Sequence, residues 1–279
     1  DEPINGSPMN VVESLQPVPA SVSQRTGAGS GLGPILEMES VGLQIPVYTT
    51  EMRSLGSTLI CSVTGGGLRR HKGGAVIDAL CDLNLYVDHG ERIALIGHNG
   101  AGKSTFLRLI SGIYHPTSGR MKVHAFVYPM IHKSFITSPE LSGLQAVKAH
   151  YLMMQGNLRG FDDFLADVRN FSGLGDYINL PVKGYSQGMV ARLLFAVLTG
   201  ITHECLALDE GIGAGDSNFV AAAQQRLDSF IQAAGTLFLA SHSDELLRRF
   251  CSRGLVFNQG RIVFDGELEM ALTHYYKKL

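Results

Sequence analysis

The fold is decided by the stretch Gly97-His98-Asn99-Gly100-Ala101-Gly102-Lys103-Ser104, which follows an apolar run at 93–96 and opens an expected helix over 103–110. It fits the pattern G-x-x-x-x-G-K-[ST] in the strand-to-helix context that a phosphate-binding loop requires. Glycines let the backbone curl so that successive N–H groups point at phosphate oxygens, and the helix start adds partial positive charge. The pattern would occur by chance in roughly one chain of this length in a hundred. The stretch therefore predicts nucleotide binding.

The residues of this loop suit a nucleoside triphosphate. We expect Lys103 to reach the β- and γ-phosphates and the Ser104 hydroxyl to bind Mg²⁺. The expected nucleotide contacts are Gly97, His98, Asn99, Gly100, Ala101, Gly102, Lys103, Ser104 and Thr105. Kinases, GTPases and ATPases share such a loop, so other segments must distinguish among them.

Polar residues also follow two later apolar runs. Asp209 and Glu210 end the run at 205–208, and His242 follows the run at 237–240. Parallel strands beside the loop strand would bring these side chains to the same sheet edge. Asp209 then suits Mg²⁺, directly or through water, and Glu210 can polarise the attacking water as a general base. From the same edge His242 can reach the γ-phosphate and hold that water in place.

A second possible anion site lies in the segment 184–192, which reads GYSQGMVAR. Ser186 offers a hydroxyl and Gly188 an unshielded amide at the start of an apolar helix, and both groups suit an anion. Taken alone, the pattern is typical of an ordinary serine-capped helix. Because the chain already has one phosphate-binding loop, a second anion site is best explained if it serves the nucleotide of a partner subunit.

Apolar periodicity predicts an α/β fold with a parallel core sheet, because strand-like and helix-like segments alternate. Strands are expected at 41–47, 58–63, 75–85, 92–96, 121–128, 205–208 and 236–240, with a hairpin at 254–264. Helices are expected at 103–110, 144–154, 161–171, 189–198, 221–234, from Asp244 onward and at 268–277. Residues 1–36, rich in Ser, Gly and Pro, are expected to form a flexible tail.

Composition bears on partners and location. The formal net charge of −2 does not favour a nucleic-acid partner. No apolar run approaches the roughly 18–20 residues that span a bilayer, and no signal-peptide pattern opens the chain. Cys61, Cys81, Cys205 and Cys251 are dispersed along the sequence, so neither a zinc site nor a redox dithiol is expected.

Taken together, these segments resemble the ATP-binding cassette of ABC transporters. The resemblance rests on 97–105, 185–189, Asp209–Glu210 and His242, which occur in the family's order and approximate spacing. Within that family the chain is similar to the subfamily that exports polysaccharides such as O-antigen, capsule and teichoic acid. The closer likeness rests on IPVY at 45–48, GIYHPTSG at 112–119, YSQGM at 185–189, and the acidic pair followed by Gly215-Asp216.

The resemblance implies a P-loop NTPase fold. An ABC ATPase cassette would occupy 37–279, with a RecA-like core, an antiparallel β subdomain and a helical subdomain at about 139–195. Two copies would pack head to tail, with each ATP between one chain's loop and the other chain's Ser186 and Gly188. Asp216 would lie in the loop that crosses the interface, and Tyr48 would stack on adenine.

This sequence departs from the family pattern in three places. The segment 185–189 reads YSQGM where the family has LSGGQ, although the serine and the second glycine remain. No glutamine occurs between 123 and 144, so His132 or Lys133 is the candidate for that family position. For the aromatic that stacks on adenine, His71 is an alternative to Tyr48.

The resemblance further implies an ATPase that uses ATP and Mg²⁺ to drive a separate integral-membrane permease. We expect a homodimer, peripheral on the cytoplasmic side of the inner membrane, with polysaccharide cargo, no nucleic acid, and permease contact near 138–153. The chain ends shortly after its last expected helix, so no carbohydrate-binding domain is expected there. Two alternatives remain: a soluble ABC ATPase of DNA repair or translation, and a P-loop kinase of a small metabolite.

Overall fold

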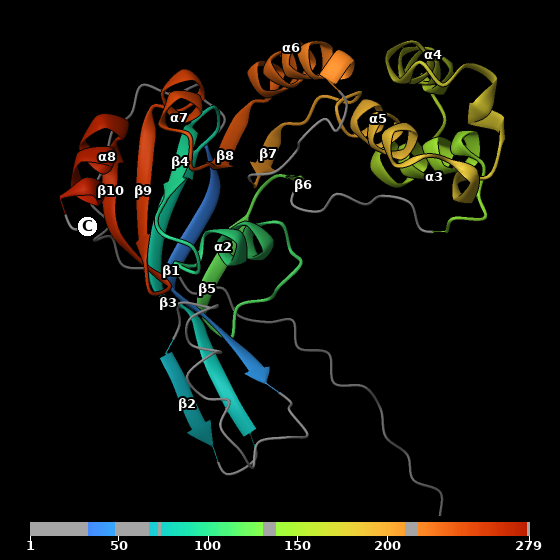
Figure 1. The fold of residues 1–279 in the computed structure, drawn as a ribbon. Coiled ribbons are helices and arrows are strands. Elements are labelled where there is room, and N and C mark those ends of the chain that lie inside the picture. The colour runs from blue at the N-terminus through green and yellow to red at the C-terminus, as the bar shows by residue number, and fades with distance from the viewer. Residues whose placement is uncertain (1–32, 48–66, 72–73, 131–137, 210–216, 278–279) are drawn as a thin grey trace, which may run out of the picture.

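The computed structural model describes residues 33–47, 67–71, 74–130, 138–209 and 217–277. Two sheets lie side by side, and a group of helices stands apart from them (Figure 1). The α/β fold class with an antiparallel sheet and a separate helical group is confirmed. Among the described residues no helix has both the length and the apolar character needed to cross a bilayer.

The larger sheet has six strands in the order β10-β9-β4-β8-β7-β6. Its bounds are β4 Arg92–Ile96, β6 Val127–Met130, β7 Cys205–Leu208, β8 Thr236–Ala240, β9 Arg253–Asn258 and β10 Arg261–Glu267. All neighbours pair in parallel except β9 and β10, which form the expected antiparallel hairpin. Because parallel strands carry their carboxyl ends to one edge, the segments that follow β4, β7 and β8 meet there.

The smaller sheet is antiparallel, in the order β2-β3-β1-β5. Its strands are β1 Pro34–Val47, β2 Gly67–His71, β3 Gly74–Asp88 and β5 Ser118–Val123. β1 includes residues 34–36, so the last part of the expected tail is strand. The strand expected at 58–63 lies outside the described residues.

The prediction of one strand at 121–128 is wrong. The chain instead forms β5 in the antiparallel sheet and β6 in the parallel sheet, with 124–126 between them. The backbone N–H of His124 donates to the carbonyl of Ile35 at 2.9 Å, so this linker still follows β1. The apolar pattern continues across the junction because residues on both sides face a core, and it therefore hides the change of sheet.

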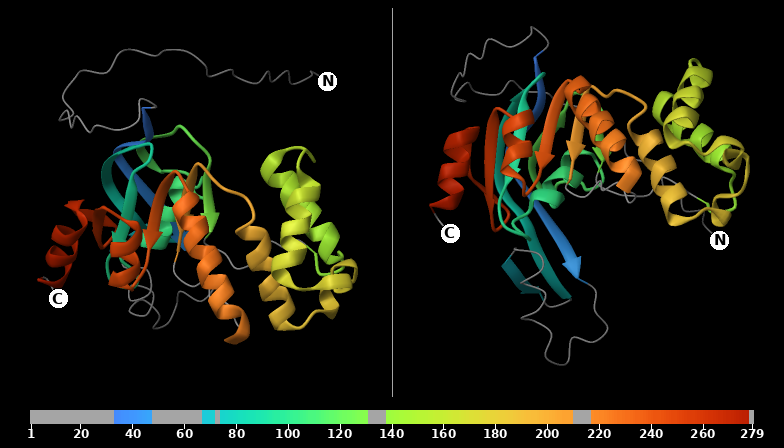
Figure 2. Two further views of the ribbon diagram at one scale, coloured as in Figure 1. Left: turned by 90° about the horizontal axis from the view of Figure 1, so that it is seen from above. Right: turned by 45° about the horizontal axis from the view of Figure 1, so that its top comes forward.

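Helices α3 Gly143–Gln155, α4 Phe161–Ser172 and α5 Gln187–Leu198 form the separate group, together with the short turns η1 Gly175–Asn179 and η2 Val182–Gly184. We call this group, residues 143–198, the helical subdomain. The other helices, α2 Lys103–Ile110, α6 Ser217–Ala233, α7 Asp244–Phe250 and α8 Leu268–Tyr276, pack on the sheets. Figure 2 shows α6 between the parallel sheet and the helical subdomain.

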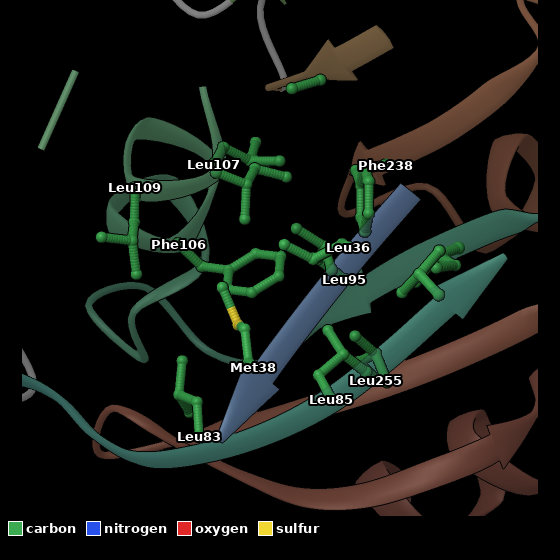
Figure 3. Close-up of a cluster of buried hydrophobic side chains, with 14 of the residues drawn as sticks. Leu36, Met38, Leu83, Leu85, Leu95, Phe106, Leu107, Leu109, Phe238 and Leu255 are labelled. Atoms are coloured by element: carbon green, nitrogen blue, oxygen red, sulfur yellow. The ribbon is translucent and has the colours of Figure 1, made fainter. Parts of the chain in front are cut away.

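Alternate side chains of the parallel strands divide between two apolar cores. Ile93 and Leu95 of β4 face the core shared with the antiparallel sheet and α2, whereas Ala94 and Ile96 face α6, α7 and α8. Figure 3 shows the first core, in which the α2 side chain Phe106 lies among Leu36, Met38 and Leu95. Phe106 is completely buried, and burial of such a ring contributes about 1.5–3 kcal/mol. The core therefore anchors the helix that follows the loop.

A cluster of rings lies where the helical subdomain meets the parallel sheet. His203, just before β7, stacks on Tyr128 of β6 with ring centroids 3.7 Å apart. Burial lowers the pKa of His150 on α3 to about 4. Burial, and then the charge of His150, lower the pKa of His203 to about 4. Both imidazoles are therefore neutral at pH 7, and the cluster tolerates positive charge poorly.

We expect stability to fall on mild acidification. Because the folded pKa of His150 is about 4 and its ordinary value is 6.5, the unfolded chain binds more protons between these pH values. The stabilisation is complete above pH 6.5 and is lost as the pH falls toward 4, by up to about 3 kcal/mol for His150. Urea unfolding at about pH 7.5 and 5 measures this loss. His150→Leu should reduce it, whereas the change of exposed His115 to Leu should not; an unchanged loss in His150→Leu would contradict the assignment.

Candidate nucleotide-binding site

The loop between β4 and α2 adopts the curled backbone that its glycines permit. Gly97, Gly100 and Gly102 have φ angles of 153°, 80° and 115°, a range in which residues with a Cβ are strained. A Cβ on Gly97 would also lie 2.6 Å from the carbonyl oxygen of Phe257 in β9. The loop can therefore pack closely against the end of β9 only with glycine at this position.

Hydrogen bonds hold the loop against the β9–β10 turn. The N–H of Ala101 donates to the His98 carbonyl at 3.1 Å, and the N–H of Gly260 donates to the Ala101 carbonyl at 2.9 Å. The Lys103 ammonium donates to the carbonyls of Gly97 and, at 3.2 Å, His98. Lys103 is 9% exposed, so its charge is held close to the loop amides, where it favours an anion.

A cleft of about 620 Å³ opens beside this loop at the carboxyl edge of the parallel sheet. Eight of the predicted residues line it, namely Asn99, Gly100, Gly102, Lys103, Ser104, Thr105, Asp209 and His242. Gly97, His98 and Ala101 belong to the loop but do not line the cleft. The structure thus brings together loop, acidic residue and histidine from three separate segments, as the strand order requires.

The histidine after β8 is tied directly to the loop. The Nε2 of His242 lies 3.0 Å from the Oδ1 of Asn99. The ring of His98 contacts the Asn99 carbonyl at 2.8 Å and the Oδ1 of Asn258 at 3.3 Å. The sequence predicts only a loop contact for Asn99, because a contact between residues 143 positions apart depends on strand order.

Two cleft residues with polar groups, Arg108 and Tyr114, were not predicted. Arg108 and Tyr114 line the cleft from α2 and from the segment after it, and Ile45 and Ile77 of the antiparallel sheet add apolar surface. Arg108 lies four residues after Ser104 on one helix, so the two share a face. That spacing was a readable signal for Arg108. Tyr114 lies in the segment 112–119 that carries the likeness to the subfamily, but its spacing indicated no contact with the nucleotide.

The donor set of the cleft fits a magnesium ion. Ser104 offers a hydroxyl and Asp209 a carboxylate, and both line the same cleft. Mg²⁺ takes oxygen ligands and typically uses one or two protein groups together with phosphate oxygens and waters. The residues present therefore suit this ion.

The residues predicted to form a second anion site lie elsewhere in the chain. The Ser186 hydroxyl accepts a hydrogen bond from the Met189 N–H at 3.2 Å and so caps α5. A Cβ added to Gly188 would meet only the Ser186 hydroxyl, at 3.9 Å, so this side of the backbone is open. Neither residue lines the cleft, and Figure 1 shows α5 separated from α2. We call the pair Ser186 and Gly188 the α5 tip.

Several predicted site residues lie outside the part of the chain that the structure describes. They are Tyr48, Glu210 and Asp216, together with His132 and Lys133. His71 belongs to β2, but the position of its side chain is not described. The choice between Tyr48 and His71 as the adenine-stacking residue therefore stays a prediction.

Comparisons with known proteins agree with this geometry. The family model described as ABC transporter matches residues 80–213. The O-antigen export system ATP-binding protein RfbE of Yersinia enterocolitica is 33% identical over 81% of this chain and 95% of its own length. The ABC transporter protein AbcA of Aeromonas salmonicida is 30% identical over 88% and 77%. The teichoic acids export ATP-binding protein TagH of Lactococcus lactis is 32% identical, but the chain spans only 42% of it.

Solved structures agree on the fold. The ATP-binding subunit of an ABC transporter superposes with a TM-score of 0.61 over 88% of this chain and 98% of its own, at 18% identity. The cassette MJ0796, solved as a dimer in a post-hydrolysis state with ADP and Pi, superposes with a TM-score of 0.57 over 84% and 98%. The loop, the cleft and these relatives together show that the chain belongs to the family of ABC transporter ATP-binding proteins and that it is an ATPase.

Proposed function

We propose that this chain is the ATP-hydrolysing subunit of an exporter that moves a lipid-linked polysaccharide through a separate membrane permease. One observation carries the motor part of the proposal: the loop cleft and the α5 tip lie on different parts of one chain. Each is half of a phosphate site. A head-to-tail pair of identical chains would complete both halves at once.

Within one chain, the loop side would bind and prepare the triphosphate. The loop amides and Lys103 would hold the phosphates, and Ser104 and Asp209 would hold Mg²⁺, which would supply positive charge to the phosphate oxygens. His242, held by Asn99 at 3.0 Å, lies at the same cleft and can contact the γ-phosphate. We assign the general-base role to Glu210, which directly follows Asp209 in the sequence.

The partner chain would contribute Ser186 and Gly188, with Asp216 in the crossing loop. ATP would then bridge two chains through its γ-phosphate, and hydrolysis would remove the bridge. The closed pair is favoured only while the triphosphate is intact, which is a ligand-driven shift between two states. The solved dimer of the cassette MJ0796 supports such a pairing.

The helical subdomain would contact the permease. Leu152 and Met153 of α3 and Leu158, just after it, are exposed, at 38%, 61% and 43%. Exposed apolar side chains that lie close together are typical of protein contact surfaces. This supports a permease contact at the end of the region 138–153 that the sequence indicates. With that contact, the subunit would be peripheral on the cytoplasmic side of the inner membrane.

The polysaccharide cargo is proposed from the relatives. RfbE is described as an O-antigen export protein and TagH as a teichoic acids export protein. To test it, Lys103→Met would be expressed in the source organism in place of the wild type. Surface polysaccharide should be lost and lipid-linked polysaccharide should accumulate inside, whereas the exposed-surface control Lys122→Met on β5 should behave as wild type. Normal surface polysaccharide with Lys103→Met would refute the cargo assignment.

The general-base assignment predicts a trapped pair. Glu210→Gln should still bind ATP but turn it over at least about 100-fold more slowly, because the amide cannot accept the proton of the attacking water. Gel filtration with ATP should then show a lasting dimer. Glu204→Gln, at the other end of β7, is the control and should hydrolyse ATP normally. Turnover at the wild-type rate in Glu210→Gln would remove Glu210 from this role.

The shared-site assignment predicts that Ser186→Arg stops hydrolysis without preventing nucleotide binding to the loop. A long side chain at the α5 tip would block the partner's phosphate, so turnover should fall at least about tenfold. A fluorescent ATP analogue should bind the single chain as before. The matched control is Ser142→Arg, because Ser142 caps α3 in the same way, accepting from the Gln145 N–H at 3.2 Å. Equal turnover in the Ser186 and Ser142 variants would refute the shared site.

A further inference from the structure

Helix α6 belongs to both parts of the molecule. Toward its end, Phe230 and Ile231 pack in the core of the parallel sheet with Leu206 and Leu237. Toward its start, Phe219 packs against Phe171 of α4 and Phe195 of α5, with ring centroids 5.1 and 6.0 Å apart. Figure 2 shows α6 running from the sheet to the helical subdomain. α6 therefore packs against both the parallel sheet and the helical subdomain and connects them.

Arg226 lies on α6 between these two contacts and binds α4 and α5 together. Its guanidinium pairs with both carboxylate oxygens of Asp167 on α4, with Nη1 to Oδ1 at 2.9 Å. Its Nε donates to the Thr199 hydroxyl at 2.7 Å, and Nη2 donates to the Ala196 carbonyl at 3.3 Å. The guanidinium carbon also lies 4.3 Å from the ring centroid of Phe171.

These contacts use the particular shape of arginine. A planar fork can meet a carboxylate with two parallel hydrogen bonds, stack on a ring and reach further acceptors, whereas a lysine ammonium cannot do all three. The Arg226 side chain is 17% exposed and the Asp167 side chain 45%, so water screens the pair mainly from the aspartate side. Thr199 is fixed in turn, because its hydroxyl donates to the Phe195 carbonyl at 2.7 Å.

The attachment lies at the end of α5 that is far from Ser186. Ala196 and Thr199 are at the C-terminal end of α5, and Ser186 caps its start. Twelve helical residues span about 18 Å, so a tilt of roughly 10° about the attached end would move the α5 tip by about 3 Å. A displacement of that size would take the Ser186 hydroxyl out of hydrogen-bonding range of a phosphate.

We propose that Arg226 is a positioning residue for ATP hydrolysis, because it fixes the angle of α5 to the parallel sheet and so sets where the α5 tip meets the partner chain's nucleotide. The inference rests on the shared site proposed above. It assigns Arg226 no contact with the nucleotide. Loss of Arg226 should therefore weaken pairing of the two chains and leave binding to the loop cleft intact.

The test compares Arg226→Met with Arg248→Met in the full chain. Methionine retains apolar contact with Phe171 but removes the guanidinium group and its hydrogen bonds. Arg248 forms an exposed ion pair with Glu269 at 2.8 Å, so its loss serves as the control for a missing surface charge. Turnover is measured over a range of subunit concentrations, and the affinity for a fluorescent ATP analogue is measured on the single chain.

For Arg226→Met we expect the subunit concentration at half-maximal turnover to rise at least about fivefold, while the affinity for the analogue stays within about twofold of wild type. In Arg226→Lys this concentration should rise less than in Arg226→Met, because lysine retains the positive charge. If Arg226 had only a structural role, the concentration of folded subunit at half-maximal turnover would not change. Circular dichroism measures the folded fraction for this comparison. Should Arg226→Met fail to fold, Asp167→Asn removes the ion pair alone and should shift the concentration in the same direction by less.

Ser186→Arg, measured alongside, separates this inference from the proposed function. If Ser186→Arg stops turnover but Arg226→Met and Asp167→Asn both match Arg248→Met, the positioning role is refuted and the shared site stands. If Ser186→Arg turns over normally, the shared site itself is refuted, and the positioning role is refuted with it.

Discussion

The structure depends on the close approach of the loop backbone to the end of β9. Only a residue without a Cβ can occupy position 97, because a Cβ would lie 2.6 Å from the Phe257 carbonyl oxygen. The Gly260 N–H then bonds the Ala101 carbonyl from the β9–β10 turn. α2 begins directly after this loop and places Phe106 in the main core. A single steric requirement therefore joins the phosphate loop, the hairpin and the centre of the fold.

The sequence predicts best those elements whose apolar pattern lies within one short segment. β4, β7, β8 and α2 begin where their apolar patterns indicate, and the loop, Asp209 and His242 meet at one edge because parallel strands must end together. The division of 121–128 into two strands was not predictable, because both halves face a core. Contacts such as Asn99 with His242, and Arg226 with Asp167, join residues 143 and 59 positions apart, and no local pattern encodes them.

The family resemblance and the geometry explain different parts of the reaction centre. The residues in the cleft account for binding a triphosphate with its ion, but they leave the serine and glycine at the start of α5 without a phosphate to bind. In the proposed shared site, a second chain would bring that helix start to the cleft. The placement of the cleft and the α5 tip on different parts of one chain is thus a reason for a dimer besides the relatives.

The two parts of the chain are joined by contacts of different chemistry. Near β6 and β7, His150 of the helical subdomain acts through its charge on His203, which in turn stacks on Tyr128. At α6 it is an arginine fork with a small set of phenylalanine rings. Ring stacks and forked ion pairs are directional, whereas an extended apolar interface is not. Directional contacts fix an angle between bodies and release it when one contact breaks, which would suit a subunit whose α5 tip has to meet a partner chain in the proposed shared site.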